Sequence, residues 1–131
     1  MRFHILISVI LSFSVPVFAS SYVSVLKCGA DSNRFELFLD KEDSSNALYS
    51  FGAPELRSLS ELQTRKLNLV NDSGQESTRI ALSYSKAEES LVYNDITKKL
   101  DLKLNGQNAS MECTLTANNE NQPILYKLNK L

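Results

Sequence analysis

Histidine and tryptophan are almost absent from this sequence. Its 131 residues include one histidine, His4, and no tryptophan. His4 lies in an N-terminal segment that we expect to be removed, and the rest of the chain then lacks an imidazole for Ser-His-Asp or Cys-His catalysis. Zinc sites are usually built from histidines and closely spaced cysteine pairs, and the remaining chain has neither. We therefore expect a protein that is not an enzyme and that has no catalytic residue, metal or cofactor.

The sequence also lacks an excess of either charge. Once Arg2 is removed with the N-terminal segment, 13 Lys and Arg residues stand against 15 Asp and Glu residues. The basic residues are scattered along the chain, and the densest groups are Arg65 with Lys66 and Lys98 with Lys99. Nucleic-acid binding requires a clustered basic surface, so we expect no nucleic-acid partner.

Long hydrophobic runs are confined to the N-terminus, which reads MRFHILISVILSFSVPVFAS. It combines a positive charge at Arg2, an apolar run over 5–13 and small or apolar residues just before the end of VFA at Ala19. This pattern is typical of a secretory signal peptide, whereas a membrane-spanning helix needs about 18 or more uninterrupted apolar residues. We predict a signal peptide over 1–19, a single β domain over 20–131 without an integral membrane segment, and a periplasmic or secreted location.

Only two cysteines are present, and each lies in an alternating apolar and polar pattern. Cys28 ends the stretch YVSVLKC, and Cys113 lies in ASMECTL. Exported chains mature in an oxidising compartment, where two lone cysteines usually pair. We therefore predict a disulfide between Cys28 and Cys113, either between neighbouring strands or across the core. On chain-entropy grounds, closing a loop of about 85 residues stabilises the fold by about 4.6 kcal/mol.

Alternation of apolar and polar residues recurs along most of the chain. RFELFLD (34–40) alternates and is expected to form a hairpin with ALYSFG (47–52). The clearest hairpin covers 100–116, where Asn105 and Gly106 predict a tight primed turn. Short strands joined by Asn-, Ser- and Gly-rich turns are typical of antiparallel barrels and sandwiches. The predicted fold is all-β: a small antiparallel β-barrel or sandwich of about eight short strands, tied by one disulfide.

Two segments are harder to assign. Leucines recur at helical spacing within 55–65, near a Ser-x-x-Glu capping pattern. We predict one or two helical turns around 59–65 that lead into a strand over 66–70. Apolar residues alternate again over 124–128, which predicts a last short strand.

Two groups of acidic residues are candidates for chemistry. Glu88, Glu89 and Asp95 are close in the chain and raise the possibility of a glycosidase carboxylate pair. The acidic residues over 40–43 raise that of a calcium loop, but they lack the glycine and distal glutamate of an EF-hand. Acidic residues in strand connections usually face water, so we interpret both groups as solvated turns.

The stretch DSGQESTRIALSYSKAEESL resembles the family of small periplasmic or membrane-bound inhibitors of c-type lysozyme. The resemblance rests on a Ser73-Gly74 turn, an aromatic strand residue at Tyr84, a lysine at Lys86 and an acidic residue at Glu89. It also rests on an exported cysteine early and late in the chain. The resemblance implies a disulfide-tied antiparallel barrel whose Ser73 and Lys86 loops enter a lysozyme cleft and bond its catalytic carboxylates.

These observations lead to two functional hypotheses. The first is an exported, non-catalytic β domain that binds a protein, glycan or envelope partner through its loops, with lysozyme inhibition as its most specific form. The alternative is a structural or lipid-handling envelope protein whose barrel interior holds an apolar ligand. A lined cavity in the interior would favour the second hypothesis, and a packed interior would favour the first.

Overall fold

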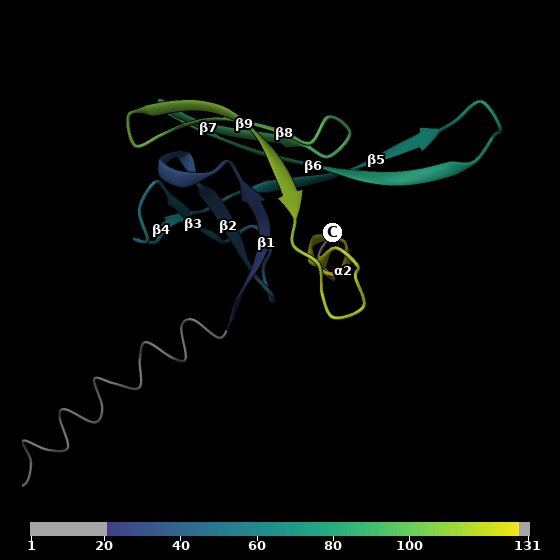
Figure 1. Cartoon of the computed structure of the whole chain (residues 1–131), viewed down its shortest axis with the longest axis horizontal. Coiled ribbons are helices and arrows are strands. Elements are labelled where there is room, and N and C mark those ends of the chain that lie inside the picture. The colour runs from purple at the N-terminus through teal and green to yellow at the C-terminus, as the bar shows by residue number, and fades with distance from the viewer. Residues whose placement is uncertain (1–20, 129–131) are drawn as a thin grey trace, which may run out of the picture.

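Nine antiparallel strands form one sheet that curls into a half-barrel in the computed structural model, which describes residues 21–128 (Figure 1). The predicted all-β fold is confirmed, with nine strands in place of about eight. The predicted signal peptide lies outside the described residues. The elements are β1 (Tyr22–Cys28), η1 (a 3-10 turn, Asp31–Asn33), β2 (Phe35–Asp40), β3 (Ala47–Phe51), β4 (Arg57–Leu59), β5 (Gln63–Val70), β6 (Glu76–Lys86), β7 (Glu89–Asn94), β8 (Lys99–Leu104), β9 (Gln107–Leu115) and α2 (Ile124–Lys127).

The strand order is β4-β3-β2-β1-β9-β8-β7-β6-β5, so the first and last strands of the chain meet in the middle of the sheet. The β1–β9 ladder has only three residue pairs, one of which is Cys28 opposite Cys113. The predicted disulfide joins these two cysteines, whose Cα atoms are 4.0 Å apart. The sequence allowed the disulfide to lie either between neighbouring strands or across the core, and the structure places it between neighbouring strands.

A bulge in β1 helps the sheet to curl. The register between β1 and β2 shifts between Ser24 and Leu26, which leaves Val25 as an extra residue without a partner on β2. Val25 and Leu26 are both fully buried, although consecutive strand residues normally point to opposite faces. Bulges bend a strand and increase its twist, so this one lets β1 contribute two neighbouring side chains to the core.

The two edges of the sheet approach each other at the β4–β5 connection. β4 and β5 are the outermost strands, yet only residues 60–62 separate them in the chain. That short link cannot span more than about 14 Å. The Leu62 amide donates to the Ser45 carbonyl oxygen at 3.0 Å, which fixes the link against the β2–β3 connection.

The helical turns predicted around 59–65 are wrong. Residues 57–59 form β4 and residues 63–70 form β5, with no helix between them. Leu59 and Leu62 are both buried, so their spacing does reflect a shared core. Both leucines reach the core because the chain turns a corner between β4 and β5. Their three-residue spacing is also that of one helical turn, which explains the wrong prediction.

The core is formed by side chains from both halves of the curled sheet, and much of it consists of leucines from alternate strand positions. The ring of Phe35 stacks on that of Tyr49, with centroids 5.8 Å apart, and meets the edge of Phe51 at 6.0 Å. The predicted hairpins also form: β2 pairs with β3, and β8 pairs with β9 through Asn105 (φ 54°) and Gly106 (φ 78°). Positive φ at both residues is what a type I′ turn requires.

The strand predicted over 124–128 is also wrong, because residues 124–127 form the helical turn α2. In a strand, consecutive side chains point to opposite faces, so Leu125 would point away from the face shared by Ile124 and Tyr126. In the helical turn Leu125 is fully buried. The Ile124 amide donates to the Thr116 carbonyl oxygen at 2.8 Å, which holds the turn beside β1 and β9.

A buried carboxylate anchors α2 to the sheet. Asp95 is 4% exposed, and its Oδ1 accepts a hydrogen bond from the Tyr93 hydroxyl at 2.9 Å. Its Oδ2 accepts a hydrogen bond from the Tyr126 hydroxyl. Burial raises the pKa of Tyr93 strongly, and the hydrogen bond to Asp95 and the charge of Asp95 raise it further.

We expect removal of the disulfide to weaken the whole fold. The double variant Cys28→Ala/Cys113→Ala should lower the free energy of unfolding by about 2–4 kcal/mol, because the unfolded chain regains the entropy of an open loop. Urea unfolding followed by circular dichroism measures this change. Reduction of the unmodified protein serves as the matched control and should give a similar shift; an unchanged midpoint in both would contradict the central role of the bond.

Tyr93 should make the protein sensitive to alkaline pH. A folded pKa above the unfolded value of about 10 contributes stability below pH ~10, and this stability is lost as the pH rises further. Tyr93→Phe should therefore be less stable at neutral pH, because Asp95 loses a donor, yet should lose less stability between pH ~10 and ~11. Urea unfolding over this pH range tests the prediction, and equal slopes for the two proteins would refute it.

Candidate functional site

The five candidate binding residues from the sequence fall at two distant places. Ser73 and Gly74 lie in the turn between β5 and β6, whereas Tyr84, Lys86 and Glu89 lie at the other end of β6. β6 has 11 residues, so these two places are about 35 Å apart. The structure brings together the last three residues and leaves the first two apart from them (Figure 1).

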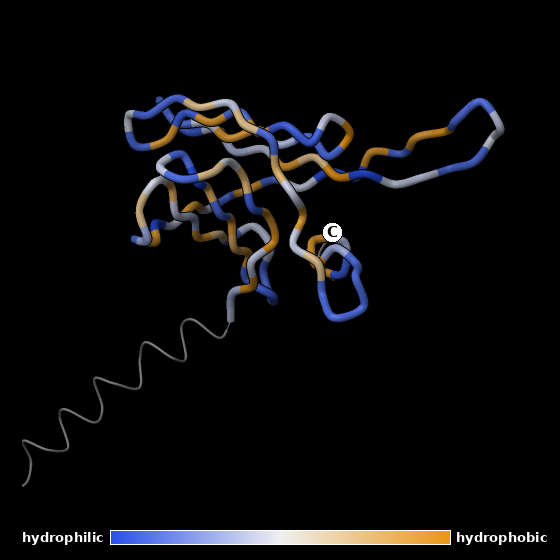
Figure 2. The backbone as a smooth tube through the Cα atoms, viewed as in Figure 1, coloured by the Kyte–Doolittle hydropathy of each residue, from blue (hydrophilic) through white to orange (hydrophobic). Residues whose placement is uncertain are grey.

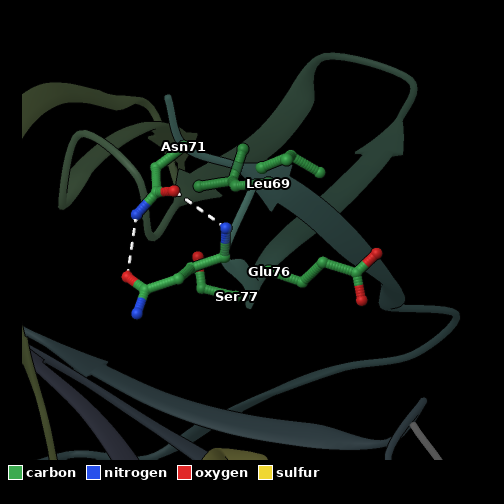
Figure 3. A pocket seen from close by; sticks show the side chains of 6 residues that line it. Leu69, Asn71, Glu76 and Ser77 are labelled. Carbon is green, nitrogen blue, oxygen red and sulfur yellow. Dashed lines mark hydrogen bonds between the residues drawn. The ribbon is translucent and has the colours of Figure 1, made fainter. Parts of the chain in front are cut away.

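The Ser73-Gly74 turn is shaped by Asn71. The Asn71 Oδ1 accepts hydrogen bonds from the amides of Ser73 and Gln75, both at 2.9 Å, and its Nδ2 donates to Gln75 Oε1 at 3.0 Å (Figure 3). Gly74 has a φ of +82°, which a residue with a side chain adopts only at a cost. The turn is therefore well defined but fully exposed, and it presents the Ser73 hydroxyl to solvent.

Lys86 is held by the link between the two edge strands. Its Nζ lies 2.5 Å from a carboxylate oxygen of Glu61 and donates to the Ser60 hydroxyl at 3.1 Å. The hydrogen bond with Lys86 lowers the pKa of Glu61, and the same bond raises the pKa of Lys86. Both side chains are exposed, so water screens the pair and its contribution to stability is small. Its main effect is to keep the ammonium group beside Ser60 and Glu61.

Tyr84 and Glu89 support this end of the sheet. Tyr84 is only 7% exposed, so most of its ring is part of the core. The Glu89 Oε2 accepts a hydrogen bond from the Asn105 amide at 3.0 Å, which ties the start of β7 to the β8–β9 turn. Lys86 and Glu89 are directly opposite each other in the β6–β7 ladder.

The acidic residues considered for catalysis do not share a site. Glu89 begins β7, whereas Asp95 follows its last residue, and six strand residues span about 20 Å. Asp95 is buried beneath two tyrosines, as described above, and Glu88 is exposed. Glu89 and Asp95 therefore do not form a carboxylate pair.

A hollow of about 210 Å³ lies at the same end of the sheet as Glu89 and Asn105, and we name it the mouth. It is lined by residues of β3, of the β3–β4 connection, of β4, of the β8–β9 turn and of the start of β9. The mouth is lined by Tyr49, Phe51, Ala53, Glu55, Arg57, Asn105 and Gln107. Phe51, Ala53 and Gln107 also line a neighbouring hollow, which extends to η1 and to Asn108.

The mouth combines aromatic, amide and charged groups. Arg57 forms an exposed ion pair with Glu55 at 2.9 Å. Burial raises the pKa of Tyr49, the nearby charge of Glu89 raises it further, and Arg57 opposes these effects. Phe51 is half-buried. Aromatic residues, side-chain amides and a nearby ion pair around one hollow suit a ligand rich in hydroxyl groups, because the polar groups can hydrogen-bond such a ligand and orient it.

Sequence reasoning missed the mouth because its residues come from separate segments without a local motif. Tyr49, Arg57 and Gln107 have no shared spacing. They meet only because β3, the start of β4 and the start of β9 lie around the same hollow of the curled sheet. The Asn105-Gly106 turn was the one part visible in the sequence.

No protein-family model, curated protein or solved structure matches this chain. Between residues 21 and 128, no helix has the length and apolar character needed to cross a bilayer. The same part of the chain contains no group of three or more His, Cys, Asp or Glu side chains that could hold a metal ion.

We expect Glu89 to hold the rim of the mouth in place. Glu89→Ala removes the acceptor of the Asn105 amide and should lower the free energy of unfolding by about 0.5–1.5 kcal/mol. The neighbouring Glu88→Ala is the matched control, because Glu88 is exposed and has no hydrogen bond within the described chain. Urea unfolding of both variants tests this role, and equal midpoints would contradict it.

Proposed function

We propose that the protein is an exported, non-catalytic binding domain that engages a glycan or a glycan-bearing envelope partner through its mouth. The observation that supports this proposal is the convergence of Tyr49, Phe51, Arg57 and Gln107 around one hollow. Export is supported by the cross-strand disulfide, since such bonds persist mainly in oxidising compartments.

The mouth is well suited to binding because its lining residues lie on, or next to, fixed strands. The Glu89–Asn105 hydrogen bond fixes the β8–β9 turn, which contributes Asn105 to the mouth. Loops carried on a fixed sheet lose little conformational freedom when a ligand binds, which lowers the cost of association.

We favour this proposal over an apolar ligand inside the barrel because packed side chains occupy the interior. Leu37, Leu82, Leu91, Tyr93 and Leu100 are all fully buried and come from both halves of the sheet. An interior ligand would have to displace part of this core, which costs free energy for each side chain moved.

Binding to labelled oligosaccharides, screened on an array and then measured by titration, tests the proposal. Arg57→Ala and Gln107→Ala should each weaken binding by about tenfold, since each removes a charged or polar contact. Ser73→Ala, at the far end of β6, is the control and should bind as the unmodified protein does. The proposal would be contradicted if no glycan bound, or if both mouth variants bound as tightly as the unmodified protein.

Lysozyme inhibition is the most specific form of the binding hypothesis, and the structure constrains how it would operate. Ser73 and Lys86 are about 35 Å apart, so they cannot both contact one pair of catalytic carboxylates. Inhibition through the mouth end should therefore be lost in Lys86→Ala and retained in Ser73→Ala. Full lysozyme activity in the presence of excess protein would remove this form and leave glycan binding to be judged separately.

A further inference from the structure

A two-stranded ribbon, which we name the arm, projects from the body of the sheet (Figure 1). The arm comprises residues 66–80: the end of β5, the turn over 71–75 and the start of β6. β7 pairs with β6 only from Ala81 onwards. Ile80 joins the arm to the body, because it is buried in the core and its carbonyl oxygen accepts a hydrogen bond from the Asp95 amide at 3.0 Å. The other residues of 66–70 and 76–80 pair only with each other within the described chain.

The arm leaves apolar side chains in water. Leu67 and Leu69 are half-buried, and Val70 is 64% exposed. Figure 2 shows these residues as an apolar stretch along β5, outside the body. An isolated two-stranded hairpin is marginally stable in water, whereas three or more strands with an apolar face are stable. The arm therefore has the composition of a structure that gains stability from additional strands.

The outer edge of β5 is open to such pairing. β5 is an edge strand with eight consecutive residue pairs to β6, no register shift and no proline. Proteins usually protect exposed edges with short strands, bulges, prolines or charges. Here charges are present only at Arg65 and Lys66, in the half of the strand nearer the body.

The two faces of the arm differ in character. Directly opposite residues of an antiparallel pair share a face. The pairing of Leu67 with Arg79 and of Leu69 with Ser77 places both leucines on one face. On the other face, Val70 lies opposite Glu76, and Lys66 lies four residues before Val70 on the same side. Figure 3 shows Leu69, Glu76 and Ser77 around the open hollow at the end of the arm.

We propose that the arm is a dimerisation element, in which β5 pairs antiparallel with β5 of a second copy of this chain. The twofold axis passes between the two copies of Asn68. Leu67 of each copy then lies opposite Leu69 of the other. The two arms then form a four-stranded sheet whose leucines cluster on one face. The bodies lie at opposite ends of this sheet, because each arm projects away from its own body.

Charge complementarity favours a second copy as the occupant. In this register Lys66 lies beside Val70 of the second copy. Glu76 of the second copy is the partner of that Val70, so it lies two strand spacings, about 10 Å, from Lys66. The lysine and glutamate side chains are long enough to meet above Val70 and form an ion pair. A parallel arrangement would instead place Lys66 beside Lys66. Neither Lys66 nor Glu76 has an ion pair within residues 21–128, so both charges are available.

Sedimentation equilibrium of the exported protein tests the proposal. The unmodified protein should form a dimer, and Lys66→Glu or Glu76→Lys should each raise the dissociation constant by about tenfold or more, because each places like charges together. Lys103→Glu makes the same charge change on an exposed position of β8 and should leave the dimer unchanged. A monomer at millimolar concentration, or equal effects of Lys66→Glu and Lys103→Glu, would overturn the proposal.

Combining the changes tests the register. A mixture of the Lys66→Glu and Glu76→Lys proteins should form heterodimers, because the reversed charge of each faces an opposite charge on the other. The double variant Lys66→Glu/Glu76→Lys should recover homodimers. Near-ultraviolet circular dichroism of each variant reports whether the body remains folded. Folded variants that stay monomeric both in the mixture and as the double variant would overturn antiparallel pairing at Asn68.

Discussion

The short seam between β1 and β9 is the constraint on which the fold depends. The first and last strands share only three residue pairs, yet every other strand is attached to one side or the other of this seam. The Cys28–Cys113 bond lies at the seam and makes it covalent. Four strands on one side and five on the other are thereby held in register, while the leucine core fills the space between them. The curl, the approach of the two edges and the mouth all follow from this arrangement.

Much of the fold could be predicted because strand alternation and turn chemistry are local signals. The segments around Leu100 and the Asn105-Gly106 turn needed no tertiary information, and two lone cysteines allowed only one pairing within the chain. The corner at 60–62 and the turn α2 could not be predicted, because burial of Leu62 and Leu125 decided them against the local pattern. The distance between Ser73 and Lys86 could not be predicted either, because a separation of thirteen residues does not show whether the chain between them is extended or folded back.

The ends of the curled sheet have different tasks. At one end, the Glu89–Asn105 hydrogen bond fixes the β8–β9 turn beside the mouth, and Lys86 and Glu61 pair across the link between β4 and β5. Near the other end of β7, the Tyr93–Asp95–Tyr126 hydrogen bonds hold α2 against the sheet. The arm belongs to neither group, because it is attached to the body only through the continuation of β5 and β6. A molecule that binds through its mouth and associates through its arm would present two mouths on one rigid unit, which raises the effective affinity for a repetitive ligand.

The position of the disulfide also determines how the molecule responds to mechanical force. A load applied to the two ends of the chain would be carried by β1, by the sulfur bridge and by the segment after β9. β2 would share part of it, because β1 pairs with β2 along its length. The bridge would keep the loop between Cys28 and Cys113, the mouth and the arm included, from being drawn out, so only the residues outside the bridge could be extended.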